Sequence, residues 1–159
     1  MEDAVDHILQ QWHRERPDLD VSPIGVIGRL SRAADAVEAR LEDTYALHGL
    51  DGSSYDVLAT LRRAGHPYEL SPAELSRTAM ISSSAVAQRV NKLVTRGWVK
   101  RGKSATDGRG TLVRLTAAGL ARIEAALPAH LANEHTIVSA LTKAEQATLI
   151  SLLRKLTAT

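Results

Sequence analysis

Cysteine is absent from this chain of 159 residues, and its absence excludes several kinds of chemistry. A disulfide scaffold, a zinc site with cysteine ligands, a cysteine nucleophile and a thiol-based peroxide switch all require it. Phenylalanine is also absent, and aromatic residues make up only 3% of the chain. The core is therefore expected to consist of leucine, isoleucine, valine and alanine.

Long apolar runs are missing as well. No run approaches the roughly 20 residues that cross a bilayer, and the acidic start lacks the basic and apolar regions of a secretion signal. We therefore expect a cytoplasmic protein with no membrane partner. The chain length and the hydrophobic content of 44% fit one folded domain that spans residues 1–159.

The short motifs that mark common enzyme classes do not occur either. The sequence holds no Gly-x-Ser-x-Gly nucleophile elbow, no phosphate-binding P-loop and no Gly-x-Gly-x-x-Gly fingerprint. We expect a protein that is not an enzyme and that uses no cofactor.

The net charge of +2 conceals an uneven distribution. Residues 82–114 hold eight basic side chains against one acid, a net +7, whereas the rest of the chain holds 12 basic against 17 acidic side chains, a net −5. A basic block within an acidic chain is typical of a surface that binds a polyanion. An ordinary solvated face, the alternative, would usually mix both signs. The eight basic residues are Arg89, Lys92, Arg96, Lys100, Arg101, Lys103, Arg109 and Arg114.

Apolar residues at helical spacing predict three helices in the first part of the chain. The first ends near Arg16, and the second covers about 23–48 and stops at Gly49. The third covers about 54–64, and Ser53 is expected to cap it.

A helix-turn-helix pattern follows these helices. Ser71-Pro72-Ala73-Glu74 combines a capping box with proline at the first helical position, so a short helix is expected to begin at Ser71. One of the serines at 82–84 caps the next helix, which runs to about Arg96 and ends at Gly97. Two short helices joined by a tight turn predict a helix-turn-helix.

After these helices, the spacing of hydrophobic residues changes from that of a helix to that of a strand. Residues 98–103 and 111–115 are predicted to form the two strands of a β-hairpin. A helix over about 116–140, interrupted or bent at Pro128, and a last helix opened by a capping box at Thr142 complete the chain. The expected fold class is thus mainly α, a winged helix-turn-helix over residues 53–115 with a two-stranded β-hairpin wing.

The last of the terminal helices, which comprise residues 1–48 and 116–159, is more apolar than one monomer requires. We expect these N- and C-terminal helices to form a dimerisation region, with simple packing within one chain as the alternative. The last helix carries Leu149, Ile150, Leu152, Leu153 and Leu156.

The second helix of the helix-turn-helix divides into two faces on a helical wheel. One face, expected to be buried, carries Val86, Val90, Leu93 and Val94. The polar residues on the opposite side can bond base edges and phosphates, and basic neighbours can bind phosphates. The predicted DNA contacts are Ser82, Ser83, Ser84, Gln88, Asn91, Lys92, Thr95, Arg96, Lys100, Arg101, Lys103, Asp107 and Arg109.

The tip of the hairpin places Arg109 between two glycines. Asp107, two residues earlier, can hydrogen-bond to Arg109 or to the backbone of the turn. An arginine aimed in this way suits a narrow minor groove. A solvated turn with incidental charges is the alternative.

One series of motifs extends over nearly the whole chain. It comprises Ser71-Pro72-Ala73-Glu74-Leu75, Ser84-Ala85-Val86-Ala87-Gln88-Arg89-Val90, Leu93-Val94, Gly97-Trp98-Val99, Asp107-Gly108-Arg109 and Leu115-Thr116-Ala117-Ala118-Gly119. In order and spacing this series resembles the MarR family of winged-helix regulators. The resemblance implies an obligate homodimer on double-stranded DNA, with recognition helices in successive major grooves and wings in the minor groove. It also implies a repressor that a small ligand releases.

Four further residues resemble the PecS or urate-responsive branch of that family in type and order, namely Trp12, Asp56, Arg63 and Arg89. On the helical wheel Arg89 lies near the edge of the buried face, so its side chain is expected to turn toward the protein. The resemblance implies a ligand site for a small anion such as urate, or a tricarboxylate such as citrate or aconitate. Arginine pairs bind anions through charge-assisted hydrogen bonds, and Asp56 can accept an N–H or hold Arg63 when the site is empty. In the alternative, Asp56 and Arg63 belong to an ordinary ion-pair network and Trp12 to the dimer core.

A metal-responsive regulator is a second alternative, beside one that responds to no ligand. His130 and Glu134 are four residues apart on one helix, and His135 is next to them. Such pairs on exposed helices are mostly solvated, so no metal site is expected.

Overall fold

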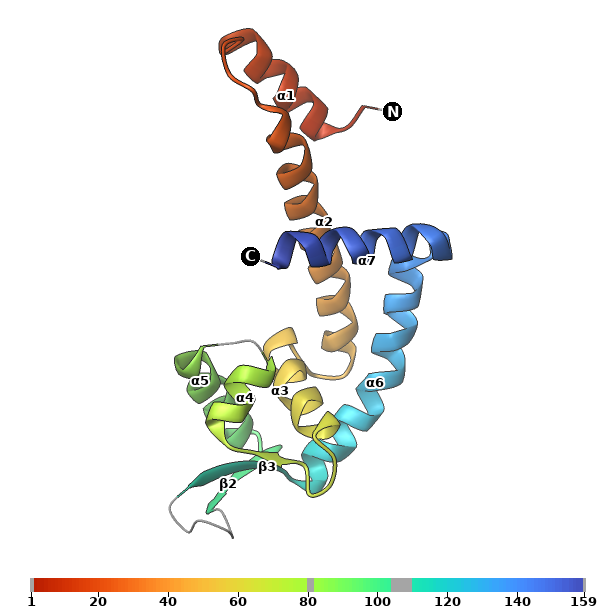
Figure 1. Cartoon of the computed structure of the whole chain (residues 1–159). Coiled ribbons are helices and arrows are strands. Elements are labelled where there is room, and N and C mark those ends of the chain that lie inside the picture. Colours follow the sequence, from red (N-terminus) through yellow and green to blue (C-terminus); the bar gives the residue numbers. More distant parts are fainter. Residues whose placement is uncertain (1, 80–81, 104–109, 159) are drawn as a thin grey trace. The chain divides into compact units, whose positions relative to one another are not determined.

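The computed structural model describes residues 2–79, 82–103 and 110–158. It is mainly helical, with one small antiparallel sheet (Figure 1). The elements in chain order are α1 (Ala4–Glu15), α2 (Ser22–Leu47), α3 (Gly52–Arg63), β1 (Glu69–Leu70), α4 (Pro72–Ala79), α5 (Ser83–Thr95), β2 (Val99–Lys103), β3 (Thr111–Leu115), α6 (Ala117–Val138) and α7 (Lys143–Thr157).

Contacts between Cα atoms divide the chain into two compact units, Met1–Arg40 and Leu41–Thr159. Within the described residues no helix is both long and apolar enough to cross a membrane.

The first unit is held together by α1 and the beginning of α2. Asp3 and Asp6 form a capping box at the start of α1, and both carboxylates accept hydrogen bonds from Arg29 of α2 at 2.6–3.1 Å. Val5 is buried, and a Cβ at Gly28 would lie 3.3 Å from its side chain. The small residue on α2 therefore lets α1 pack closely.

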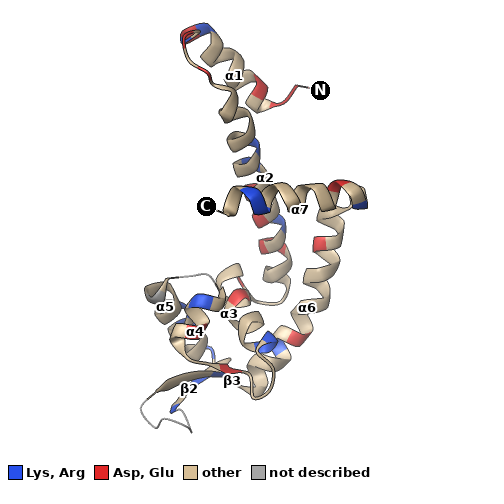
Figure 2. Ribbon diagram, in the orientation of Figure 1, with Lys and Arg blue, Asp and Glu red and all other residues tan. Residues whose placement is uncertain are grey.

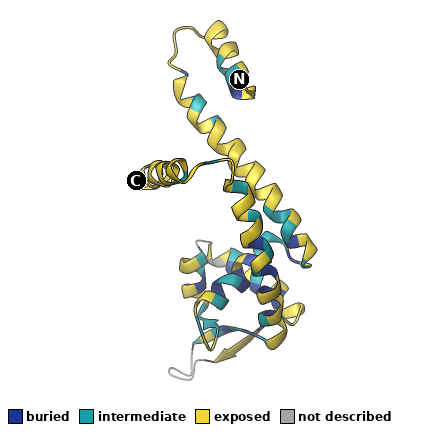
Figure 3. Cartoon of the chain, turned by 90° about the vertical axis from the view of Figure 1, so that its right-hand side faces the viewer, coloured by how far each residue is buried: buried dark blue, intermediate teal, exposed yellow. Residues whose placement is uncertain are grey.

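The second unit contains the core, which lies where α3, α4, α5 and α6 meet the sheet (Figure 3). Its largest fully buried side chains are Leu58, Leu61, Leu75, Leu93 and Ile123. The composition predicted a core of aliphatic residues alone, but Tyr45 and Tyr55 are buried in it as well.

The sheet has three strands in the order β1-β3-β2. The predicted hairpin is present, with Val99 opposite Leu115 and Lys103 opposite Thr111. The third strand, β1, was not expected from the sequence and pairs with the other edge of β3. Glu69 of β1 is opposite Arg114, and the two side chains form an ion pair.

Most predicted helix boundaries are confirmed, with two differences. Asp51 rather than Ser53 caps α3, since the carboxylate of Asp51 accepts the N–H of Ser54 at 3.0 Å. An interruption of α6 at Pro128, one of two expected outcomes, does not occur. The missing N–H removes a single helical hydrogen bond, and His130, two residues later, packs on Tyr55 of α3 with the ring centroids 4.4 Å apart.

The last helix, α7, leaves much of its surface exposed. All of its residues are described, and each is at least partly exposed (Figure 3). Its five large apolar residues, which are 37–51% exposed, are Leu149, Ile150, Leu152, Leu153 and Leu156.

Candidate nucleic-acid interface and ligand pocket

Helix α5 is the predicted recognition helix, and local capping sets both of its ends. The hydroxyl of Ser82 accepts the N–H of Ala85 at 3.3 Å, and Gly97 adopts a φ of +70°, which favours glycine and ends the helix. Val86, Val90 and Leu93 are buried as predicted.

The prediction that Val94 is buried is wrong, because its side chain is 39% exposed. On the helical wheel, 100° separates it from Leu93. The buried residues Val86, Val90 and Leu93 span only about 60° of the wheel, a narrower arc than the predicted face.

The predicted DNA-facing residues of α5, namely Ser84, Gln88, Asn91 and Thr95, are all exposed. Asn91 is also in contact with the wing, since Arg101 of β2 donates to its side-chain oxygen at 2.7 Å. That bond leaves the amide NH₂ of Asn91 as a donor. The reading helix and the wing are therefore connected through a residue pair that was expected to bind DNA separately.

Residues 82–103 contain basic residues but no acid, so α5 and β2 carry no red ribbon in Figure 2. Lys100 and Lys103 are exposed on β2. Asp107, Arg109 and the side chain of Ser83 lie outside the described part of the chain, so their predicted DNA contacts stay predictions.

Two residues that were expected to bind phosphates have partners within the chain. The Lys92 ammonium lies 2.6 Å from a carboxylate oxygen of Asp51, and Arg96 donates to the carbonyl oxygen of Gly49 at 3.2 Å. Partial burial alone would raise the pKa of Asp51, but hydrogen bonds from Lys92, Ser53 and the Ser54 N–H outweigh burial and hold that pKa well below its usual range.

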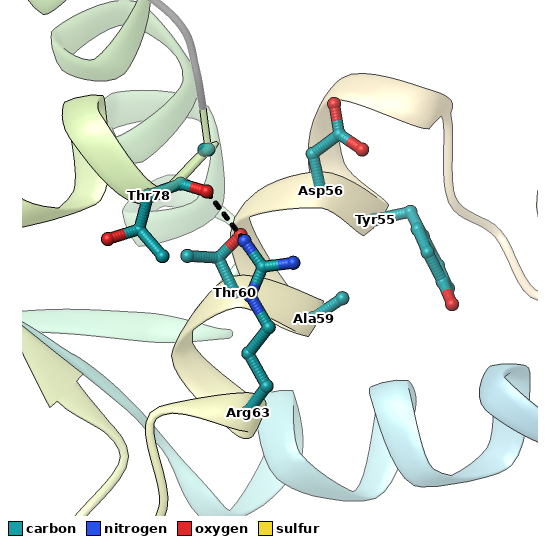
Figure 4. A pocket seen from close by; sticks show the side chains of 7 residues that line it. Tyr55, Asp56, Ala59, Thr60, Arg63 and Thr78 are labelled. Atoms are coloured by element: carbon teal, nitrogen blue, oxygen red, sulfur yellow. Dashed lines mark hydrogen bonds between the residues drawn. The ribbon is translucent and has the colours of Figure 1, made fainter. Parts of the chain in front are cut away.

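A pocket of about 320 Å³ lies between α3 and α4 (Figure 4). Arg63 reaches into it from the end of α3 and donates to the carbonyl oxygen of Thr78 at 2.6 Å. This bond uses one of the five N–H donors of the guanidinium group. The pocket is lined by Tyr55, Asp56, Ala59, Thr60, Arg63, Thr78 and Ala79.

Asp56 connects this pocket to the recognition helix. Its carboxylate accepts a hydrogen bond from Arg89 of α5 at 3.2 Å, whereas Arg63 is bonded to Thr78. The side chain of Arg89 is turned toward the protein, as the sequence predicted, and is only 26% exposed. The structure thus brings together three of the four predicted ligand residues.

The fourth predicted ligand residue, Trp12, belongs to the first unit. It lies on α1 and is 44% exposed. Beside it is a hollow of about 450 Å³, lined by Gln11, Arg14 and Glu15 as well. A ligand role for Trp12 stays a prediction.

An aromatic stack behind the pocket was missed by the sequence analysis. The ring of Tyr55, which lines the pocket, stacks on Tyr45 with the centroids 4.4 Å apart, and the His130 ring is also 4.4 Å away. Burial raises the pKa of Tyr55 to about 12, so its hydroxyl stays neutral at physiological pH. No local pattern could reveal the stack, because its members are spread over 86 positions.

His130 has partners that do not require a metal. Its ring nitrogens lie 3.3 Å from the Tyr45 hydroxyl and 3.1 Å from a carboxylate oxygen of Glu134. Throughout residues 2–79, 82–103 and 110–158, no group of three or more potential metal ligands is found.

Comparisons with known proteins agree with this architecture. A family model described as MarR family matches residues 48–110. The HTH-type transcriptional regulator PecS of Dickeya dadantii is 38% identical over 149 residues, which cover 94% of this chain and 90% of PecS.

Two solved structures are also similar to this chain. A cysteine-to-serine variant of MarR from Escherichia coli, complexed with operator DNA, has a TM-score of 0.75 at 26% identity and covers 92% of this chain and 97% of its own. A structure describing regulation of DNA binding of Bordetella bronchiseptica BpsR by 6-hydroxynicotinic acid has a TM-score of 0.73 at 26% identity, covering 84% and 98% of the two chains.

Proposed function

Because this chain belongs to the MarR family of DNA-binding transcriptional regulators, we propose that it is a ligand-released repressor acting as a homodimer on a pseudo-palindromic operator. One observation carries the proposal of ligand release. Asp56 lines a pocket and at the same time holds Arg89 of the recognition helix. A ligand that enters this pocket can therefore disturb α5 directly.

The apolar surface of α7 supports a homodimer. Leu149, Ile150 and Leu152 are among its exposed side chains, and a soluble protein rarely leaves such a surface uncovered. Each chain carries one recognition helix, so two chains related by a two-fold axis would read two half-sites.

Sedimentation of the chain with its operator tests this assembly. We expect two protomers on each operator, with half-sites about 10 bp apart, because successive major grooves are one helical turn apart. Operator footprinting supplies the half-site spacing. A single protomer bound to the operator would contradict the proposal.

The proposed ligand is a small anion, with urate as the first candidate and a tricarboxylate such as citrate or aconitate as the second. Arg63 offers the positive charge, and Thr60 and Asp56 add polar groups on the same wall of the pocket. The relative BpsR, whose DNA binding is regulated by 6-hydroxynicotinic acid, supports a planar heteroaromatic acid in this family. The ligand must bind the DNA-incompetent state more tightly than the DNA-bound state.

Replacing Arg63 with alanine should abolish release from DNA by the ligand while DNA affinity stays within about twofold. An effector typically changes the affinity for DNA by about 5- to 150-fold, and in this variant the ligand should no longer cause that change. Arg63 does not belong to α5, so the reading surface is unchanged. Gel shifts with urate, citrate and aconitate measure the release.

Arg62→Ala is the matched control, because it removes the same charge from the adjacent position. Arg62 pairs with Glu124 of α6 and does not line the pocket. Undiminished release of the Arg63→Ala variant, together with a normal response of the control, would show that the ligand binds elsewhere.

A further inference from the structure

Three basic residues form one stripe along α5. Arg89, Lys92 and Arg96 follow one another at intervals of three and four residues, so they share a face of the helix. At 100° per residue this face lies between the DNA-facing residues, such as Gln88, and the buried residues, such as Leu93. The stripe thus runs along the flank of the helix.

The flank is opposite the turn between α2 and α3, residues 48–51, which we call the α2–α3 corner. The corner is fixed by contacts of its own. Gly49 adopts a φ of +66°, Leu50 is buried in the core, and Arg122 of α6 donates to the carbonyl oxygen of His48 at 2.9 Å. Asp51 is the N-cap of α3. The corner therefore offers fixed acceptors to a neighbouring helix.

Two members of the basic stripe bind these acceptors. The ammonium of Lys92 lies 2.6 Å from a carboxylate oxygen of Asp51, and one turn later Arg96 donates to the carbonyl oxygen of Gly49 at 3.2 Å. The guanidinium of Arg96 also lies over the Trp98 ring, 5.0 Å from its centroid. Both contacts oppose rotation of α5 about its own axis.

We propose that Asp51 is a positioning residue for DNA recognition, which by holding Lys92 sets the rotation of α5 and hence the direction of Gln88 and Asn91. The inference rests on DNA binding through α5. A carboxylate beside a DNA-binding surface would by charge alone oppose binding. If Asp51 positions α5, however, removal of its carboxylate should weaken DNA binding, whereas its charge alone predicts tighter binding.

Asp51→Asn tests the proposal, because asparagine caps helices about as well as aspartate while carrying no charge. We expect a roughly two- to fivefold loss of operator affinity, the size expected for a partly exposed ion pair. Lys92→Ala leaves the cap intact and should cost a similar factor. The double variant should bind no more weakly than either single variant, since both remove one contact.

The dependence of affinity on salt concentration separates positioning from phosphate contact. Neither Asp51→Asn nor Lys92→Ala should change the slope of log K against log salt, whereas the control Lys100→Ala, on the exposed strand β2, should lower its magnitude by about 1. Tighter binding by Asp51→Asn, or a lower slope in Lys92→Ala, would overturn the positioning role. An unchanged slope in Lys100→Ala would contradict the DNA-facing surface and leave the test of Asp51 intact.

Discussion

Replacing Gly119 with alanine is expected to lower the free energy of unfolding by about 3 kcal/mol or more. A Cβ at this position would lie well inside van der Waals contact with the carbonyl oxygen of Trp98 and 2.8 Å from its carbonyl carbon. That carbonyl cannot move freely, because it accepts hydrogen bonds from the N–H of Thr116 at 3.1 Å and from the Thr116 hydroxyl at 3.2 Å. The close approach of α6 to the start of the wing therefore requires glycine.

Denaturant unfolding at one fixed protein concentration measures the effect, since the stability of the proposed dimer would depend on concentration. Gly102→Ala is the control, because no atom lies within 4 Å of its Cβ position. That variant should differ from the unmodified chain by no more than about 0.5 kcal/mol. A Gly119→Ala variant as stable as the control would contradict the close approach of Gly119 to the Trp98 carbonyl.

Leu93→Ala should cost about 2–5 kcal/mol of stability, the range found when a fully buried leucine is truncated. Leu93 has no exposed surface, and it lies on α5, the predicted recognition helix. The lost contacts attach α5 to the core, so operator binding should weaken as well. Unfolding curves and gel shifts measured on the same preparation report both effects.

The adjacent Val94→Ala provides a direct comparison, because it also shortens an aliphatic side chain of α5. Val94 is 39% exposed, so its truncation should cost less than about 1 kcal/mol. Equal losses of stability in the two variants would contradict the burial of Leu93 and the exposure of Val94.

Local signals in the sequence were sufficient for most of the secondary structure. The capping boxes at Ser71 and Thr142 form as predicted, with Glu74 and Glu145 accepting the cap N–H groups at 2.8 and 2.7 Å. These motifs involve residues only three positions apart, so the sequence displays them completely. The strand β1 is different, because two residues are too few to show a period. It exists only through pairing with β3, 45 positions later.

The cap of α3 shows a second limit of local reasoning. Aspartate and serine are both favoured at the N-cap, and Asp51 and Ser53 are only two positions apart. Helix α3 begins at Gly52, so Asp51 takes the N-cap position, and Lys92 binds its carboxylate from a helix 41 positions away. A single sequence cannot display that contact.

For the candidate site, helical periodicity predicted which face each residue occupies, but not where a long side chain ends. Arg89 was correctly expected to turn toward the protein, and its partner proved to be Asp56. Lys92 was expected to bind a phosphate and Arg101 to contact DNA, because lysine and arginine commonly do so. Both side chains are long and flexible, and their partners in the folded chain come from other elements.

Few amino acids can replace Asp51. Its carboxylate both caps α3 and holds Lys92, and these two tasks accept different substitutes. Serine, threonine or asparagine would preserve the cap without the charge, while glutamate would keep the charge on a longer side chain that caps poorly. Aspartate alone meets both demands, so a change here would be tolerated most readily when position 92 changes with it.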